Sequence, residues 1–377
     1  MDPRIAQLLE QGQSVWQDDI SRQMIESGEI ARIVAQGVRG LTSNPSIFEK
    51  AIAGGDAYDA DVARLAGEGL DAQRIFEAVA VDDIRATCDL FLPVYEAAEG
   101  GDGFVSIEVS PGAARDADRT RQEARRLWQT VDRPNLMVKI PGTMEGAPVI
   151  GEMLVEGINI NVTLLFAIDS YVRVAESYVA ALEARQAAGK PVDRIASVAS
   201  FFVSRVDTLV DKLLDETIAE TGDQGLAALK GKAAVANAKL AYVRFEELFR
   251  SERFAPLAAA GARVQRPLWA STSVKNPTYR DVLYVEELIG PDTVNTMPRP
   301  TIEAFLDHGV VERTVDTDVE DARQTWAALA AAGIDLEAAT DRLEEEGIAT
   351  FVKSYDALIA GVEGKRAQMV EATAVAD

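Results

Sequence analysis

One lysine occupies a position where its amine could become reactive. Lys139 is the charged residue in an apolar stretch, residues 135–143, whose composition is typical of a buried β-strand. Because side chains alternate between the faces of a strand, Lys139 shares a face with Met137, and the apolar residues beside them point the other way. Burial disfavours the ammonium form, and a neutral lysine amine attacks carbonyl carbons to form a Schiff base. For this strand alone, a lysine that protects an exposed sheet edge is the alternative.

Further polar side chains follow other apolar stretches, at the points where predicted strands end. They are Asp18, Asn44, Glu108, Asn161 with Thr163, Ser200 with Arg205, and Ser271 with Ser273 and Lys275. Each has a simpler explanation by itself, such as a helix cap for Asp18, a turn for Asn44 or a solvated loop for Lys275. The carboxyl ends of the strands of a parallel barrel meet at one rim, so together these residues predict one polar site around Lys139.

The elements that would position these residues alternate along the chain. Strands are predicted at residues 14–19, 37–45, 104–109, 135–143, 157–165, 195–202, 266–271 and 293–296. Helices are predicted at residues 1–13, 21–36, 47–64, 71–98, 118–131, 147–155, 168–188, 204–220, 225–248 and 280–288, and at 325–332, 336–343 and 349–362. Eight strand–helix units predict an α/β fold, a (β/α)8 TIM barrel with additional helices and a C-terminal helical extension. An open doubly wound sheet is the alternative, but the sequence has neither of the glycine-rich phosphate-binding motifs typical of such sheets.

The composition is ordinary for a globular protein, but the charge is not. Hydrophobic residues make up 47% and charged residues 26% of the 377 residues, and the formal net charge is −23. A surface this acidic repels nucleic acid and anionic lipid. The sequence has no apolar run of membrane-spanning length, and its first residues are unlike a signal peptide. We therefore expect a cytoplasmic protein with no nucleic-acid partner and no membrane partner.

The scarcity of cysteine and histidine limits the possible chemistry. Cys88 and His308 are the single residues of their kinds, so an intrachain disulfide and a zinc site built on thiolates are excluded. We interpret Cys88 as a core residue and His308, near the end of a helical pattern, as structural. Acid–base chemistry would therefore fall to carboxylates and lysine.

Five stretches, in their order and spacing over about residues 14–310, resemble the transaldolases. They are Gly40–Ser46, Ser106–Val109, Leu136–Pro141, Gly157–Phe166 and Trp269–Thr272. The chain length and the stretch Asn295–Pro298 are most similar to the longer bacterial members. The resemblance implies one domain over residues 1–377, with a barrel at about 14–310 and C-terminal helices at about 311–377 packed on it.

The same resemblance implies a transferase of aldehyde or ketone residues in the pentose phosphate pathway, with sugar-phosphate substrates and no cofactor or metal. A dihydroxyacetone unit would pass from sedoheptulose 7-phosphate or fructose 6-phosphate to glyceraldehyde 3-phosphate or erythrose 4-phosphate. Lys139 would form the Schiff base, and Asp18 would exchange the proton of the hydroxyl beside the breaking bond. Glu108 would act through a water held with Thr163.

Substrate binding is implied for the remaining residues. Asn44 and Asn161 would bind the dihydroxyacetone hydroxyls, and the phosphate would contact Ser200, Phe202, Arg205, Ser271, Ser273 and Lys275. The match is less close here, because shorter transaldolases have Ser-Pro-Phe before their arginine where this chain has Ser200-Phe201-Phe202. They also have an arginine at the position of Lys275.

Two other functions are compatible with parts of this pattern. A Schiff-base aldolase of the fructose 6-phosphate type needs the same lysine and acids but releases the aldehyde instead of transferring the ketol unit. A non-catalytic sugar-phosphate-binding barrel has no need of Asp18, Glu108 and Lys139 together. The sequence predicts a monomer or a homodimer without deciding between them.

Overall fold

Eight parallel strands close into a barrel in the computed structural model, which describes residues 1–376 and the side chains of residues 1–370. The strands are β1 (Gln13–Gln17), β2 (Gly40–Leu41), β3 (Val105–Glu108), β4 (Leu136–Pro141), β5 (Ile160–Leu165), β6 (Ser197–Phe202), β7 (Arg266–Ala270) and β8 (Thr293–Met297). Each strand pairs with the next along the chain, and β8 returns to pair with β1. The prediction of a closed barrel is confirmed, and the doubly wound alternative is excluded.

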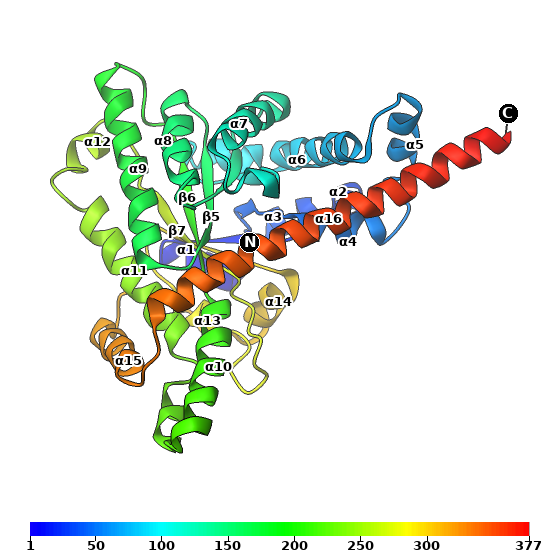
Figure 1. The fold of residues 1–377 in the computed structure, drawn as a ribbon. Helices are drawn as coiled ribbons and strands as arrows, with labels where there is room; N and C mark the ends of the chain where they lie inside the picture. Colours follow the sequence, from blue (N-terminus) through cyan, green and yellow to red (C-terminus); the bar gives the residue numbers. More distant parts are fainter. Residues whose placement is uncertain (377) are drawn as a thin grey trace.

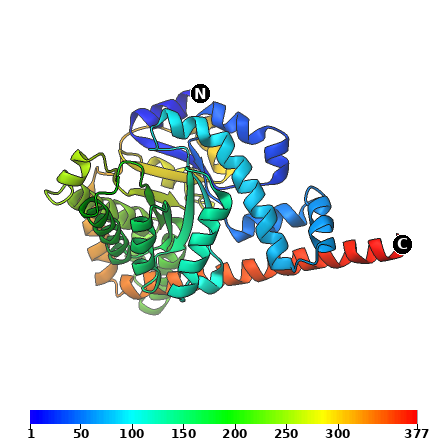
Figure 2. The same ribbon diagram turned by 90° about the horizontal axis from the view of Figure 1, so that it is seen from above.

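Helices surround the barrel (Figures 1 and 2). They are α1 (Pro3–Glu10), α2 (Arg22–Glu26), α3 (Glu29–Gln36), α4 (Pro45–Ala53), α5 (Asp59–Gly67), α6 (Ala72–Ala97), α7 (Ala117–Val131), α8 (Gly146–Glu156), α9 (Ile168–Ala187), α10 (Ser204–Thr221), α11 (Ala233–Phe249), α12 (Ala255–Ala259), α13 (Leu283–Glu286), α14 (Arg299–His308), α15 (Val319–Ala331) and α16 (Leu336–Ala376), with short 3-10 helices η1 (Pro111–Ala113) and η2 (Gln224–Leu229). Side chains of Asp2, Ser21, Asn44, Asp71 and Asp116 accept backbone N–H groups at helix starts, as capping chemistry requires. No helix among the described residues combines the length and apolar character needed to cross a bilayer.

Strand β4 separates two apolar layers, as its alternation predicts. Met137 packs inside the barrel with Trp16, Val198, Leu268 and Val294. The residues that alternate with Met137 and Lys139 belong to the larger core between the strands and the helices. Met137 and Lys139 therefore share the interior face of the barrel, and Lys139 lies nearer its carboxyl end.

Several predicted helices differ from the observed ones where glycine or close packing changes the chain path. The helix predicted at 21–36 is interrupted at Gly28, whose φ of 73° is left-handed, and the one at 47–64 is two helices, α4 and α5. Part of the helix predicted at 225–248 is the 3-10 helix η2. The helices predicted at 336–343 and 349–362 are one continuous helix, α16.

Helix α16 is continuous through Gly347, which lies against the barrel. A Cβ atom at this position would lie 3.1 Å from a methyl group of Leu164, so the glycine permits close contact with β5. The helix also packs on α4, α5 and α6. It crosses the other elements and ends beyond them in both views (Figures 1 and 2).

Candidate active site

A cavity of about 430 Å³ opens at the carboxyl ends of the strands. It is lined by every expected site residue except Asn161: Asp18, Asn44, Glu108, Lys139, Thr163, Ser200, Phe202, Arg205, Ser271, Ser273 and Lys275. These residues come from segments spread over more than half of the chain. The barrel brings them together at one rim, as the strand-end pattern predicts.

Lys139 and Glu108 lie side by side because β3 and β4 pair in parallel with these two residues in register. Lys139 is 7% exposed. Its Nζ atom lies 3.3 Å from Oε2 of Glu108 and donates a hydrogen bond of 3.1 Å to the carbonyl oxygen of Ser43. The amine is thus held in one position by two oxygen atoms at the bottom of the cavity.

Burial changes the acid–base behaviour of Glu108. It raises the pKa of this carboxyl group above its ordinary value, and the positive charge and hydrogen bond of Lys139 oppose the rise. A carboxyl group whose pKa is shifted toward neutrality can both donate and accept a proton near physiological pH. Glu108 therefore has the properties of a proton-transfer group beside an amine.

A second carboxyl group faces the same amine from the end of β1. Burial raises the pKa of Asp18, while the charge of Lys139 and a hydrogen bond from Thr42 oppose the rise. Oγ1 of Thr42 donates to Oδ1 of Asp18 at 2.7 Å and lies 2.7 Å from the hydroxyl of Thr296. The two threonines hold the carboxylate in place, and the sequence analysis missed them because a threonine at a strand end has no distinctive signature.

Strand β5 is irregular beside Thr163. Its register with β6 shifts between Val162 and Leu165, and Leu164 has a φ of 59°, a left-handed conformation that is rare for a residue of this type. Such strain clusters at functional sites, where the surrounding structure maintains it. Here the irregularity lies in the segment that brings Thr163 and Leu164 to the cavity wall.

The two asparagines expected to bind substrate differ in position. Asn44 lines the cavity and caps α4, since its Oδ1 atom accepts the N–H of Ile47 at 3.0 Å; its NH2 group is the part that can donate to a ligand. Asn161 is completely buried. It donates to Oγ of Ser106 at 3.1 Å and accepts from Oγ of Ser200 at 2.7 Å, so it lies beneath the cavity and holds Ser200, which lines it.

Another part of the cavity wall is positively charged. The guanidinium of Arg205 lies 5.4 Å from the ring centre of Phe202, and Nζ of Lys275 donates to Oγ of Ser273 at 2.6 Å. Burial lowers the pKa of both cations, and the charge of Arg205 lowers that of Lys275 further. Two cations that destabilise each other are stabilised by a bound anion, so this wall suits a phosphate group.

The end of the β7 strand adds a strained serine to the charged wall. Ser271 has a φ of 56°, and its hydroxyl lies 2.9 Å from that of Ser204, the first residue of α10. The helix α10 carries Arg205 immediately after this contact. The contact between the two serines therefore joins the segment that carries Lys275 to the helix that carries Arg205.

Helix α16 supplies a side of the cavity that the sequence analysis did not identify. Gly347, Thr350, Phe351 and Ser354 line it, and the hydroxyl of Ser354 accepts a hydrogen bond of 2.7 Å from Ser46. These residue types carry no chemical signature, and their position depends on how α16 packs across the barrel. Far from this site, Cys88 is buried in the core and His308 is paired with Asp281 on the surface, as interpreted from the sequence.

A buried lysine between two carboxyl groups, near two cations at the mouth of a (β/α)8 barrel, defines a site of the Schiff-base type for phosphorylated carbonyl compounds. Comparison with known proteins gives the family. The chain belongs to the transaldolase/fructose-6-phosphate aldolase family, whose model matches residues 15–362.

Relatives in several bacteria are similar over almost their whole length, and all three of the following are named transaldolase. The protein of Trichodesmium erythraeum is 48% identical over 361 residues, which cover 94% of this chain and 95% of the relative. That of Mycolicibacterium smegmatis is 48% identical over 366 residues, 97% and 98% of the two chains. That of Thermobifida fusca is 50% identical over 361 residues, which cover 95% of this chain and 97% of the relative.

Proposed function

We propose that this chain is a transaldolase, which moves a dihydroxyacetone unit from sedoheptulose 7-phosphate or fructose 6-phosphate to glyceraldehyde 3-phosphate or erythrose 4-phosphate. The observation that carries the proposal is the buried Lys139 amine, 3.3 Å from the Glu108 carboxylate, in a cavity that also holds Asp18 and a cationic wall. Family membership and the names of the relatives support the same reaction. We also propose that residues 1–377 act as one domain, since α16 forms part of the cavity wall.

Imine formation begins the reaction. Nζ of Lys139 passes one proton to the Glu108 carboxylate beside it and adds as the free amine to the C2 carbonyl carbon of the ketose. The carbinolamine that results loses its hydroxyl as water to give a protonated imine. Glu108 supplies the proton that the departing hydroxyl needs, through a water molecule bound between it and Thr163. Its raised pKa supports this role, because the protonated carboxyl is then populated closer to neutral pH.

Carbon–carbon cleavage follows. Asp18 takes the proton from the C4 hydroxyl, the C3–C4 bond breaks, and its electron pair moves into the protonated imine to form an enamine on Lys139. The aldehyde then leaves. The enamine carbon attacks the carbonyl carbon of the acceptor aldose, and Asp18 returns its proton to the new hydroxyl. Water then adds to the protonated imine, and cleavage of its carbon–nitrogen bond releases the product ketose and Lys139.

The cationic wall would hold the phosphate of each sugar. Arg205 offers a planar fork to phosphate oxygens, and Lys275 and Ser273 add a charge and a hydroxyl beside it. Ser200, Ser271 and Phe202 complete this wall, while Asn44 donates to a dihydroxyacetone hydroxyl. Asn161 acts one step further away in this proposal, by fixing the Ser200 hydroxyl at 2.7 Å.

Borohydride trapping tests the proposal. Protein incubated with fructose 6-phosphate and reduced with borohydride should carry a three-carbon adduct on Lys139, located by peptide mass mapping. With erythrose 4-phosphate present, the adduct should disappear because the acceptor consumes the enamine. Absence of an adduct on any lysine would contradict the Schiff-base mechanism, and an adduct that acceptor does not remove would favour the aldolase alternative.

A further inference from the structure

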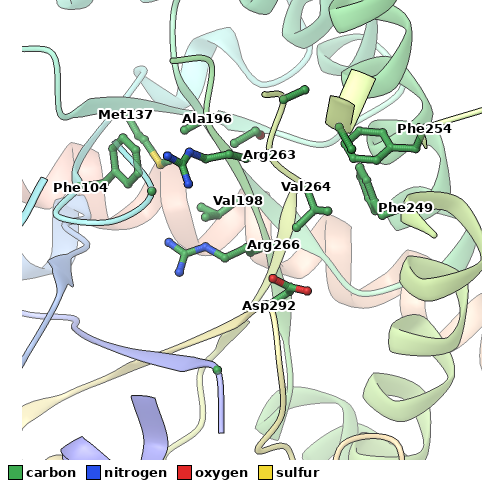
Figure 3. A pocket seen from close by; sticks show the side chains of 15 residues that line it. Phe104, Met137, Ala196, Val198, Phe249, Phe254, Arg263, Val264, Arg266 and Asp292 are labelled. Carbon is green, nitrogen blue, oxygen red and sulfur yellow. The ribbon is translucent and has the colours of Figure 1, made fainter. Parts of the chain in front are cut away.

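A second cavity, of about 400 Å³, opens at the opposite end of the barrel (Figure 3). Its walls are the segments where the chain enters β1, β3, β4, β6, β7 and β8, together with the end of α11 and α12. The cavity is almost as large as the candidate active site, and cavities of this size accommodate small organic ligands. Residues at this end of a barrel usually contribute only to stability, so a cavity here needs a separate explanation.

The wall combines apolar and polar groups in similar measure. The side chains of Phe104, Met137, Val198, Val264 and Phe254 line it. Phe104 is fixed by an edge contact with the ring of Tyr95, with 5.5 Å between ring centres. A ligand would therefore find a preformed apolar surface against which an aromatic or branched group can pack.

Two arginines line this cavity, and one of them is already neutralised. Arg266 donates to Oδ1 of Asp102 at 3.2 Å and to Oγ of Ser14 at 2.9 Å. The indole N–H of Trp16 also donates to Asp102, at 2.9 Å. The Arg266 charge thus belongs to a hydrogen-bonded network at the start of the barrel.

The other arginine has no such partner. Nη2 of Arg263 donates to the carbonyl oxygen of Glu99 at 2.9 Å, but its Nε atom is buried and has no hydrogen-bond acceptor among the described residues. Among the residues that the structure describes, no carboxylate forms an ion pair with Arg263. Its position is fixed by Gly101, where a Cβ atom would lie 2.7 Å from Nη1. In Figure 3 the guanidinium of Arg263 lies beside Phe104 and Met137.

The charges around the cavity leave one positive charge without compensation. Asp102 balances Arg266, and Asp292 on the wall lies 3.6 Å from Arg250. Arg263 is therefore the excess cation, in a protein whose net charge is −23. The Nη end of this guanidinium is the accessible part, and an anionic oxygen in the cavity would pair with its charge there.

We propose that this cavity is a second binding site, which takes a small organic monoanion: a carboxylate with an aromatic or branched apolar group. The carboxylate oxygens meet the Nη groups of Arg263, and the apolar group lies against Val264 and Ala258, which line the cavity and are partly or fully exposed. One excess positive charge matches a carboxylate better than a doubly charged phosphate monoester, which would also face Asp102 and Asp292.

The site is separate from the candidate active site. Trp16, Met137, Val198 and Leu268 fill the barrel between the two cavities. Binding here therefore needs no room in the sugar-phosphate cavity, and a sugar phosphate at the other end should not displace the ligand. This separation lets the proposal be tested whether or not the chain is a transaldolase.

Benzoate is the probe, with benzamide as its neutral counterpart of the same shape. We expect benzoate to bind in an NMR titration of the full chain at pH 7, about tenfold more tightly than benzamide, because charged hydrogen bonds are lost with the amide. Saturating fructose 6-phosphate should leave the benzoate affinity unchanged. No benzoate binding, equal binding of benzamide, or displacement by fructose 6-phosphate would each overturn the proposal.

Two variants and a control locate the site. Arg263→Gln should weaken benzoate binding by about tenfold. Arg194→Gln removes a neighbouring exposed arginine that does not line the cavity and should leave binding unchanged. Ala258→Trp, at an exposed position on the cavity wall, should block the site without disturbing the core. Full affinity in Arg263→Gln or in Ala258→Trp, or equal loss in Arg194→Gln, would show that benzoate binds elsewhere.

Discussion

Two lysines in this protein have nearly the same immediate surroundings and very different contexts. Nζ of Lys139 lies 3.3 Å from a glutamate oxygen and 3.1 Å from a backbone carbonyl, and Nζ of Lys239 lies 3.4 Å and 3.3 Å from atoms of the same kinds, in Glu287 and Thr317. Both lysines are buried, at 7% and 5% exposure. A lysine–glutamate pair with buried amine therefore does not by itself identify a catalytic site.

The partners make the difference. The side chain of Glu108 is 8% exposed, and that of Glu287 is 42% exposed, so only Glu108 loses most of its solvation. Lys139 faces a cavity with a cationic wall. Lys239 lines a hollow together with Lys232 and three carboxylates, those of Glu287, Asp318 and Asp321. The three carboxylates repel a sugar phosphate. The reactivity of a buried lysine therefore depends on a buried proton-transfer partner and on charges that attract the substrate.

The largest effect should separate the two lysines directly. Lys139→Met should abolish the borohydride-trapped adduct and reduce transaldolase turnover by at least about 10³-fold, because the nucleophile is lost. Lys239→Met should keep the adduct and the turnover. Mass mapping and a coupled assay measure both, and circular dichroism checks that each variant is folded. An adduct that persists in Lys139→Met would show that Lys139 is not the nucleophile.

Asp18→Asn should have the next largest effect, on one step only. The imine should still form on Lys139, but transfer should slow by about 10²–10⁴-fold because the proton acceptor for bond cleavage is missing. Single-turnover kinetics with trapping at successive times separate the two steps. If imine formation slowed as much as transfer, Asp18 would not have the specific role proposed for it.

Thr42→Val should shift the pH profile with a smaller loss of rate. The Thr42 hydrogen bond favours the charged form of Asp18, so its removal should raise the pKa of Asp18 further. Because the base must be deprotonated, turnover is lost as the pH falls through this pKa. We expect the acid limb of kcat to move upward by about one pH unit. A limb that stays in place, or moves downward, would contradict the assignment of Asp18 as the base.

The smallest effect concerns the stability contributed by the Lys239 pair. Replacing Lys239 by Met leaves Glu287 in contact with solvent, so the free energy of unfolding should change by no more than about 1 kcal/mol. Urea denaturation measures it. A loss of several kcal/mol would mean that Glu287 is far less solvated than its exposure indicates, and the contrast with Glu108 would weaken.

The candidate active site could be predicted from the sequence because its residues occupy strand ends. Alternation in β4 placed Lys139 on the same face as Met137, and the strand-end rule placed Glu108 at the same rim. Each of these inferences depends on local periodicity and on the rule that neighbouring strands pair. The same reasoning located the two cations of the cavity wall, since Arg205 and Lys275 lie in the segments that follow β6 and β7.

What could not be predicted depends on packing between distant segments. Asn161 and Thr163 share a face, but only the irregular end of β5 brings Thr163 to the cavity and leaves Asn161 beneath it. The line of contacts from Asp18 through Thr42 to Thr296 joins three strands by hydroxyl groups with no sequence signature. Two helices were predicted at residues 336–343 and 349–362, whereas α16 is continuous and Gly347 permits it to lie against Leu164.

The position of α16 has a consequence for biosynthesis. Because translation proceeds from the amino terminus, the barrel strands up to Met297 leave the ribosome before the helix that carries Thr350, Phe351 and Ser354. A growing chain can thus close its barrel while one wall of the candidate active site is still unmade. The wall around Lys139 is therefore completed only after α16, which follows every strand in the chain, has also been made.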